Sequence, residues 1–385
     1  MTDSAAFRRQ FPALHRVVHL ASCSWPPRSA AVAAALGAML RLQDHGRAWE
    51  HFEREADQAR ALFATLIGAR KDQVALVPNV SVGVYQVASG LVWWERPRIL
   101  ATPADFPGVG HVWQAQAPRG AQVVYANSTD RAPTVNDYIT ALDEQTGLVS
   151  VPAATYRDGA RLPVARIVQA AHAAGAAVLV DACQAVGVEP VDVTEWGCDF
   201  LVANASKYLC GQPGLAFLYA RDAADLPRLP RLTGWQAQTR PWDPLLDYRP
   251  DARRLETGTP ALGAVFAANA GMRLIQALDL VDVRRHVCAL LAYARNRLTE
   301  QGERICTPCD VERRGAHLAV LDADPEALAA WLAARGINVA PRRNVVRLAM
   351  HYFTTKSDVD ALCAALPRYR IAHPHSRAVP EPSEV

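Results

Sequence analysis

Short apolar runs alternate with amphipathic stretches through the first two thirds of the chain. The runs lack a polar residue at every second position, which is typical of strands buried on both faces of a parallel sheet. The amphipathic stretches have helical spacing, and the clearest, 163–174, begins with Pro163 and is followed by Gly175. This alternation predicts an α/β fold, in which helices cover both faces of a large, mostly parallel sheet. We expect seven strands, at 74–77, 98–101, 122–125, 148–151, 177–180, 200–203 and 215–219.

The same pattern divides the chain into domains. We expect residues 1–28 to be largely irregular and to pack on a small C-terminal domain. Helical patterns at 29–42 and 52–67 open the large domain, which we place at 29–262.

The last third of the chain has a different pattern. A long helical stretch, 263–299, leads into a short unit of helices and strands. We therefore predict a small α+β domain over 263–370, with strands at 338–340 and 345–349 paired together. The tail, 371–385, is rich in proline, histidine and charge, and we expect it to be disordered.

Composition and charge narrow the class of protein. The chain has 385 residues, of which 50% are hydrophobic and 21% charged, with a net charge of +3. This composition excludes a disordered chain or a disulfide scaffold. The low net charge does not indicate a basic surface for binding nucleic acid or a membrane. No apolar run is long enough to span a bilayer. We therefore expect a cytoplasmic protein without a nucleic-acid or membrane partner.

Cysteines and lysines limit the available chemistry. The eight cysteines are scattered, which favours reduced thiols, and the pair Cys306 and Cys309 lacks the second pair of a zinc site. We expect no metal site. Of the 41 basic residues only Lys71, Lys207 and Lys356 are lysines. Any reaction that needs a primary amine has three candidate residues.

An acidic residue and a lysine follow two neighbouring strands of the predicted sheet. Asp181 ends the apolar run 177–180, and Lys207 follows the run 200–203. In open α/β sheets ligands bind at the carboxyl ends of the strands. Alone, Asp181 would fit a helix cap and Lys207 a solvated surface lysine. Together they indicate pyridoxal 5'-phosphate, which needs a lysine for its Schiff base and an aspartate at its pyridinium nitrogen.

Four motifs add a resemblance to a known family. They are Asp-Ala-Cys-Gln-Ala-Val-Gly at 181–187, Ser-Lys-Tyr-Leu at 206–209, Glu-Thr-Gly-Thr-Pro at 256–260, and Val-Arg-Leu at 346–348 with the segment 352–358 after it. With them, nearly the whole chain resembles the class V aminotransferase and cysteine desulfurase-like family of fold-type-I enzymes, with kynureninase-like and isopenicillin N epimerase-like features. The resemblance implies the aspartate aminotransferase-like fold and use of pyridoxal 5'-phosphate.

The resemblance implies a role for each residue around the cofactor ring. Lys207 would form the Schiff base, and Asp181 would keep the pyridinium nitrogen protonated. Gln184 would reach the phenolic oxygen. Phe106 would stack on the ring.

The resemblance also implies how phosphate and substrate are bound. The backbone N–H groups of Val80 and Ser81 and the side chain of Ser206 would bind the phosphate. Thr259 would reach the phosphate of a neighbouring subunit, which implies a homodimer with shared active sites. Arg347 would hold the substrate carboxylate in a two-pronged contact that a lysine cannot make. Arg342 and Arg343 are the rival candidates for that contact.

Departures from the family pattern leave the reaction open. Desulfurases carry a cysteine on the loop after a Gly-Ile-x-Val strand, but here no cysteine follows Val339 before Cys363. They also have a histidine where this chain has Phe106. The Phe-Pro pair at 106–107 and Gly-Trp at 234–235 are kynureninase-like, yet kynureninases have histidine at Gln184 and tyrosine at Ser206.

We therefore expect an enzyme that acts on an amino acid, and transamination is the reaction that we expect first among the candidates. The alternatives are a kynureninase-like or C–S lyase and an epimerase, followed by a binding module without activity. A dinucleotide-dependent oxidoreductase is a further alternative, but Gly-Val-Gly at 108–110 lacks the remaining glycine fingerprint.

Overall fold

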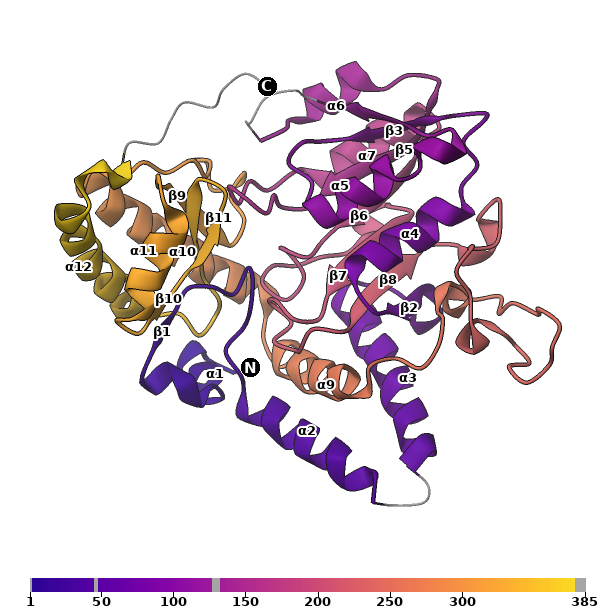
Figure 1. Cartoon of the computed structure of the whole chain (residues 1–385), viewed down its shortest axis with the longest axis horizontal. Helices are drawn as coiled ribbons and strands as arrows, with labels where there is room; N and C mark the ends of the chain where they lie inside the picture. The colour runs from indigo at the N-terminus through magenta and orange to yellow at the C-terminus, as the bar shows by residue number, and fades with distance from the viewer. Residues whose placement is uncertain (1, 45–47, 127–131, 378–385) are drawn as a thin grey trace.

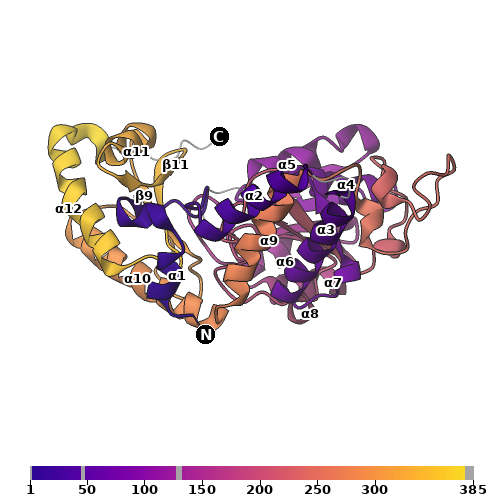
Figure 2. The ribbon, with the colours of Figure 1, turned by 90° about the horizontal axis from the view of Figure 1, so that it is seen from below.

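The computed structural model describes residues 2–44, 48–126 and 132–377, which form two lobes (Figures 1 and 2). The large lobe is built on a seven-stranded sheet with strand order β2-β8-β7-β6-β5-β3-β4. The pairs β4–β3, β3–β5, β5–β6 and β6–β7 are parallel, whereas β8 runs antiparallel to both β2 and β7. The strands are β2 (Val74–Val77), β3 (Arg98–Ala101), β4 (Gln122–Tyr125), β5 (Thr146–Pro152), β6 (Ala177–Asp181), β7 (Phe200–Asn204) and β8 (Ala216–Ala220).

Alternate side chains of these strands enter two hydrophobic layers. Val74 and Leu76 pack on one side of the sheet, and Ala75 and Val77 on the other. Because both faces are buried, the strands are continuous apolar runs, and the predicted α/β fold is confirmed. One layer holds α4 (Val80–Gly90) and α5 (Pro107–Gln114), and the other holds α3 (Ala48–Leu66), α6 (Val135–Ala141), α7 (Val164–Ala173) and α8 (Val193–Trp196).

The small lobe has an antiparallel sheet of order β11-β12-β9. Leu318 and Val346 face a core with the helices behind the sheet. Pro341 is tolerated because β11 is an edge strand. The elements are β9 (His317–Leu321), β11 (Ala340–Arg342), β12 (Val345–Ala349), α10 (Leu280–Glu300), α11 (Pro325–Ala333) and α12 (Lys356–Ala372).

The N-terminal segment is more ordered than the predicted irregular stretch. It contains α1 (Ser4–Arg9), a 3-10 helix (Pro12–His15) and β1 (Val18–His19). The Phe7 and Phe11 rings are buried against Phe353 of the small lobe. The segment therefore gains its order from apolar contacts with residues that are distant in sequence.

The strand prediction in the small lobe needs a correction. The predicted strand at 338–340 is two short strands with different partners. β10 (Ile337–Asn338) pairs in parallel with β1, and β11 pairs with β12. The split follows from the N-terminal segment, since Leu20 N–H donates to the Asn338 carbonyl (2.8 Å).

The long helical stretch predicted over 263–299 is two helices. α9 (Leu262–Gln276) ends before α10, whose first turn is capped by the Asp279 side chain on Val281 N–H. Next to α9, α2 (Ala30–Leu42) is capped by Ser29 and packs on α9. In the described part of the chain, no helix on its own has the length and apolar character to cross a membrane, while α9 and α10 do so only as a pair bent by 85°.

The predicted disordered tail also needs a correction in its first part. α12 continues to Ala372, and a 3-10 helix follows at Pro374–Arg377. Arg370, inside α12, is buried and donates to Glu303 (2.6 Å) and to Ser376 Oγ (2.9 Å). This buried network holds the segment that charge and proline content alone indicated to be disordered. The rest of that prediction, 378–385, lies outside the described residues.

Candidate active site

Asp181 and Lys207 lie at the carboxyl edge of the large sheet. Asp181 is the last residue of β6, and Lys207 comes three residues after the end of β7, the neighbouring strand. The Asp181 carboxylate is buried and accepts a hydrogen bond from Cys183 N–H (2.9 Å). Neither side chain has an ion-pair partner among the described residues. A buried carboxylate and an amine, each without a counter-charge, match what pyridoxal 5'-phosphate requires of its site.

The turn that carries Lys207 is clamped by close backbone contacts. A Cβ at Gly271, on α9, would overlap the Leu209 carbonyl oxygen and lie 2.8 Å from the Cys210 carbonyl carbon. Cys210 N–H donates to the Lys207 carbonyl (3.0 Å). His351 Nε2, from the small lobe, donates to the Tyr208 carbonyl (2.9 Å). Both lobes therefore fix the backbone that follows the lysine.

The N-terminus of α4 opens at the same edge of the sheet, directly after β2. Asn79 caps it by accepting a hydrogen bond from Val82 N–H (3.0 Å). The N–H groups of Val80 and Ser81 have no acceptor among the described residues. The Ser81 hydroxyl donates to the Gly108 carbonyl (2.8 Å), which ties α4 to α5. Free N–H groups at a helix N-terminus favour an anion such as a phosphate.

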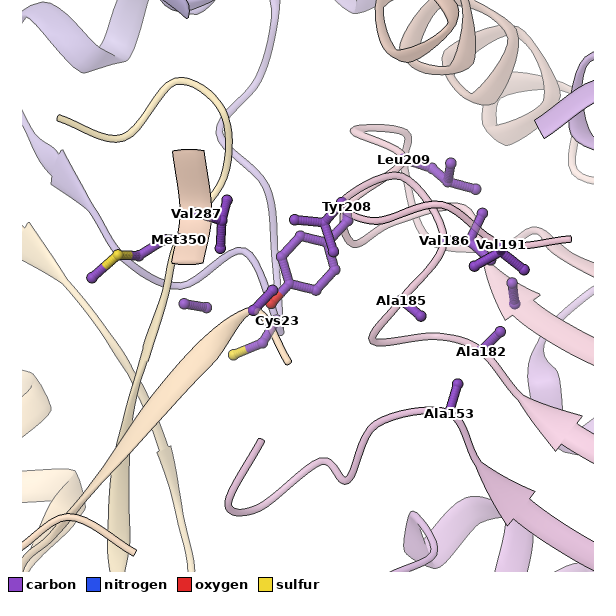
Figure 3. Close-up of a cluster of buried hydrophobic side chains, with 14 of the residues drawn as sticks. Cys23, Ala153, Ala182, Ala185, Val186, Val191, Tyr208, Leu209, Val287 and Met350 are labelled. Carbon is purple, nitrogen blue, oxygen red and sulfur yellow. The ribbon is translucent and has the colours of Figure 1, made fainter. Parts of the chain in front are cut away.

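Phe106 and Gln184 bound the space beside Lys207. The Lys207 amine lies 5.5 Å from the centre of the Phe106 ring, which is 37% exposed. Gln184 is buried, its Nε2 donates to the Cys23 carbonyl (3.1 Å), and its Oε1 has no partner. Figure 3 shows Cys23 and Tyr208 next to each other, with Met350 on one side and Ala185 on the other. The N-terminal segment thus enters the site between the lobes.

Ser206 and Thr259 are placed differently from the other predicted residues. The Ser206 hydroxyl donates to Asn204 Oδ1 (2.5 Å), so a phosphate contact would require this hydroxyl to turn. Thr259 is exposed and makes no hydrogen bond within the described residues. Its segment is anchored by Glu256, which is buried in a two-pronged ion pair with Arg60 (2.8 and 2.7 Å).

Arg347 is held on β12 by main-chain oxygens. Its Nη1 donates to the Tyr156 carbonyl (2.8 Å) and its Nε to the Ala340 carbonyl (3.3 Å), while Nη2 has no acceptor. The neighbouring His317 is buried, and burial, together with the positive charge of Arg347, lowers its pKa to about 3. His317 is therefore neutral beside the guanidinium group.

Sequence reasoning missed several residues of this site. Tyr156 packs its ring edge-on against Phe106 (centroids 5.3 Å apart), and Cys23 arrives from the N-terminal segment. Asp105 is buried next to Phe106, and burial raises its pKa to about 8. The one available signal was position, because Tyr156 and Asp105 both follow apolar strands. In the described chain no group of three histidine, cysteine, aspartate or glutamate residues could hold a metal ion.

Comparison with known proteins places the chain in a family. The model of the family "Aminotransferase class-V" matches residues 37–362. An uncharacterised aminotransferase, YcbU, of Bacillus subtilis is 35% identical over 360 residues, covering 92% of this chain and 94% of that protein. A kynureninase of Geobacillus thermodenitrificans is 27% identical and covers 76% of this chain and 73% of its own length. A probable cysteine desulfurase of Streptomyces coelicolor is also 27% identical, covering 96% and 98%.

Solved structures agree with the fold. A cysteine desulfurase from Thermococcus onnurineus superimposes with a TM-score of 0.87 at 19% identity, covering 97% of this chain and 99% of that one. The chain therefore belongs to the class V aminotransferase family and is an enzyme that depends on pyridoxal 5'-phosphate.

Proposed function

We propose that this enzyme is an aminotransferase that acts on an α-amino acid through a cofactor held by Lys207. One observation carries the proposal: Asp181 and Lys207 lie without counter-charges at adjacent strand ends, next to the free N–H groups of α4. When bound, pyridoxal 5'-phosphate withdraws electrons from the bond that breaks at the substrate Cα.

The residues around the ring then have distinct tasks. The Asp181 carboxylate holds a proton at the pyridine nitrogen. The N–H groups of Val80 and Ser81 bind the phosphate. Phe106 covers the ring and keeps water from it. Lys207 holds the cofactor by its Nζ and moves the proton released at the substrate Cα, because it is the one amine beside that atom in the described site.

The remaining residues orient the cofactor and the substrate. Gln184 has an unpaired Oε1 and a further N–H on Nε2, so its amide can donate to the phenolic oxygen. Arg347 can hold the α-carboxylate with Nη2 and the second N–H of Nη1, since its other donors are anchored to carbonyl groups. Ser206 would add a phosphate contact after its hydroxyl turns.

The β11–β12 hairpin bears on the competing reaction of the family. A two-residue turn, Arg343–Asn344, joins its strands and carries no cysteine. A nucleophilic thiol on a loop at this position is therefore missing. We expect no persulfide on the protein after incubation with cysteine, and mass spectrometry that finds a stoichiometric persulfide on one cysteine would contradict this.

The test of the reaction is a panel of amino acids added to the holoenzyme without an oxo acid. We expect each site to consume one amino acid and to form one pyridoxamine phosphate, because transamination transfers the amino group to the cofactor. Ammonia with pyruvate would instead mark a C–S lyase, and alanine without ammonia would mark a kynureninase-like enzyme. Racemised amino acid without transfer would mark an epimerase. Lys207→Ala serves as the control for unspecific cofactor chemistry.

We also propose a cytoplasmic homodimer in which Thr259 completes the phosphate site of the neighbouring subunit. Its exposure and lack of a partner within its own chain support this, as do eight cysteines that are all free. Mixed dimers of Lys207→Ala and Thr259→Ala should recover activity, because one of their two sites is intact. A monomeric holoenzyme in light scattering would contradict the proposal.

A further inference from the structure

Arg342 and Arg347 lie on the same face of the small sheet. Arg347 is opposite Ala340, and Arg342 is opposite Val345. Directly opposed residues of an antiparallel pair point to the same side, so all four share one face. Arg342 and Arg347 are diagonal neighbours on it, a relation in which residues are about 7–8 Å apart and their Cβ atoms somewhat closer.

This face looks toward the cofactor site rather than into the core of the small lobe. Arg347 donates to the Tyr156 carbonyl, and the Tyr156 ring contacts Phe106 beside Lys207. Burial, followed by repulsion from Arg347, lowers the pKa of Arg342, while Cys23 and Tyr156 act on it in the opposite sense. Arg342 therefore lies near the same residues that bound the site.

Neither guanidinium group has an ion-pair partner among the described residues. Arg342 donates only to the adjacent Pro341 carbonyl, and Nη2 of Arg347 donates to nothing. Glu326 favours the charged form of Arg342 but makes no ion pair with it in the described part of the chain. Two like charges on diagonal positions oppose each other, so the arrangement is stabilised when anions bind to both.

We propose that Arg342 binds a second anionic group on the substrate side chain, so that the preferred substrates are amino dicarboxylates. This inference rests on the proposed function, because it assigns the α-carboxylate to Arg347. One arginine then grips each end of the substrate. The neutral His317 adds no competing charge to this face.

The test compares acids with their amides, which have nearly the same shape. The holoenzyme is assayed with aspartate, asparagine, glutamate and glutamine, and binding of glutarate and its monoamide is measured by calorimetry. We expect at least one acid to exceed its amide by about tenfold or more in kcat/KM, and glutarate to bind more tightly than its monoamide, as a charged hydrogen bond requires.

Variants locate the effect. Arg342→Gln should reduce the acid-to-amide ratio of kcat/KM by about tenfold to a hundredfold, through a loss with the acid. Arg342→Lys should keep part of the ratio, and it replaces the first variant if that one does not fold. Arg343→Gln is the matched control, because Arg343 is exposed at the tip of the hairpin and should leave the ratio unchanged.

Each result separates the inference from the function on which it rests. If amino acids react but acids and amides have equal kcat/KM values, the inference fails and the proposed function stands. An equal loss of both in Arg342→Gln would mean that both arginines grip the α-carboxylate, and this would also overturn it. If no amino acid reacts while glutarate still binds more tightly than its monoamide, the proposed function fails and the second anion site stands.

Discussion

The two sides of the active site are built in different ways. On the large lobe, Asp181 and Lys207 follow consecutive strands of one sheet, and short motifs of adjacent residues carry them. On the small lobe, Arg342 and Arg347 meet because two strands pair in one register, and Cys23 arrives from the N-terminal segment. The cofactor side is thus encoded locally, whereas the substrate side depends on contacts between distant parts of the chain.

The difference has a consequence for mutation. The cofactor side is rooted in central strands with core on both faces, and its Lys207 turn has no room for change. The substrate side lies on a separate small sheet, with Arg342 on an edge strand and Arg347 buried on the central strand. We expect changes on the cofactor side to reduce both the stability of the fold and cofactor binding. Changes on the substrate side should alter substrate preference alone.

The largest effect should come from Lys207→Ala. This variant should lose all visible absorbance that borohydride removes from the wild type, because the other two lysines lie elsewhere in the fold. Lys71→Ala is the matched control, since its amine contacts Asp57 on the surface. Borohydride-sensitive absorbance that survives in Lys207→Ala would show that a different amine holds the cofactor.

The next effect should come from Gly271→Ala. The added Cβ would overlap the Leu209 carbonyl, and backbone cannot move aside as a side chain can, so we expect a loss of about 3 kcal/mol or more in unfolding free energy. Cofactor affinity should fall with it, because the Lys207 turn must shift.

Gly110→Ala is the matched control for this substitution. Gly110 also lies inside a helix, α5, but nothing lies within 4 Å of its ideal Cβ. Alanine there should be neutral or stabilise by about 0.4–1 kcal/mol. Equal unfolding free energies for the two variants in urea titrations would show that the turn is not clamped by α9.

The same contrast explains what could be predicted from sequence. The strands of the large sheet were predicted within two residues because burial on both faces makes each one a continuous apolar run. β1 was missed because a strand of two residues has no pattern of its own and exists through its pairing with β10. The pairing of β11 with β12 was predicted, but the place of the turn between them was not, because Arg343 adopts a φ of 50° that sequence would assign to glycine or asparagine.

Roles in the site divide along the same line. The motif around Asp181 and Lys207 indicated the cofactor, and the geometry brings both to one edge. Tyr156 and His317 could not be predicted, because no local pattern tells which strand faces the other lobe. The place of His317 follows from the register of β12 with β9, whereas Tyr156 follows β5 of the large lobe and meets Arg347 through its carbonyl.

Arg347→Lys should sharpen the contrast by affecting the substrate side alone. It keeps the charge but loses the planar fork, so kcat/KM should fall by a factor equivalent to about 1.5–3 kcal/mol. Cofactor binding should be unchanged. Arg343→Lys, at the exposed tip of the hairpin, is the control. If Arg347→Lys performs as the wild type while Arg342→Lys fails, the α-carboxylate belongs to Arg342.

The smallest effect concerns His351, which joins the two sides. Its Nε2 donates to the Tyr208 carbonyl, and its Nδ1 accepts from Tyr352 N–H (2.7 Å), so the ring is neutral in the fold. Burial is the largest cause that lowers its pKa from 6.5 to about 4, and the nearby His19 and His286 add to it. Protonation would remove the acceptor at Nδ1 and place a charge between the lobes.

Because the pKa of His351 is lower in the folded chain, the unfolded chain binds the proton first as pH falls. The resulting stability is complete above pH 6.5 and is lost between 6.5 and about 4. At pH 5.5 the loss of unfolding free energy from this residue should be about 1.4 kcal/mol relative to pH 7.5.

His351→Gln removes the titrating group, so its urea midpoint should change less over this range than that of the wild type. The buried His317 titrates in both proteins and cancels in the comparison. Parallel pH dependences in the two proteins would show that the junction between cofactor side and substrate side does not rest on a neutral His351.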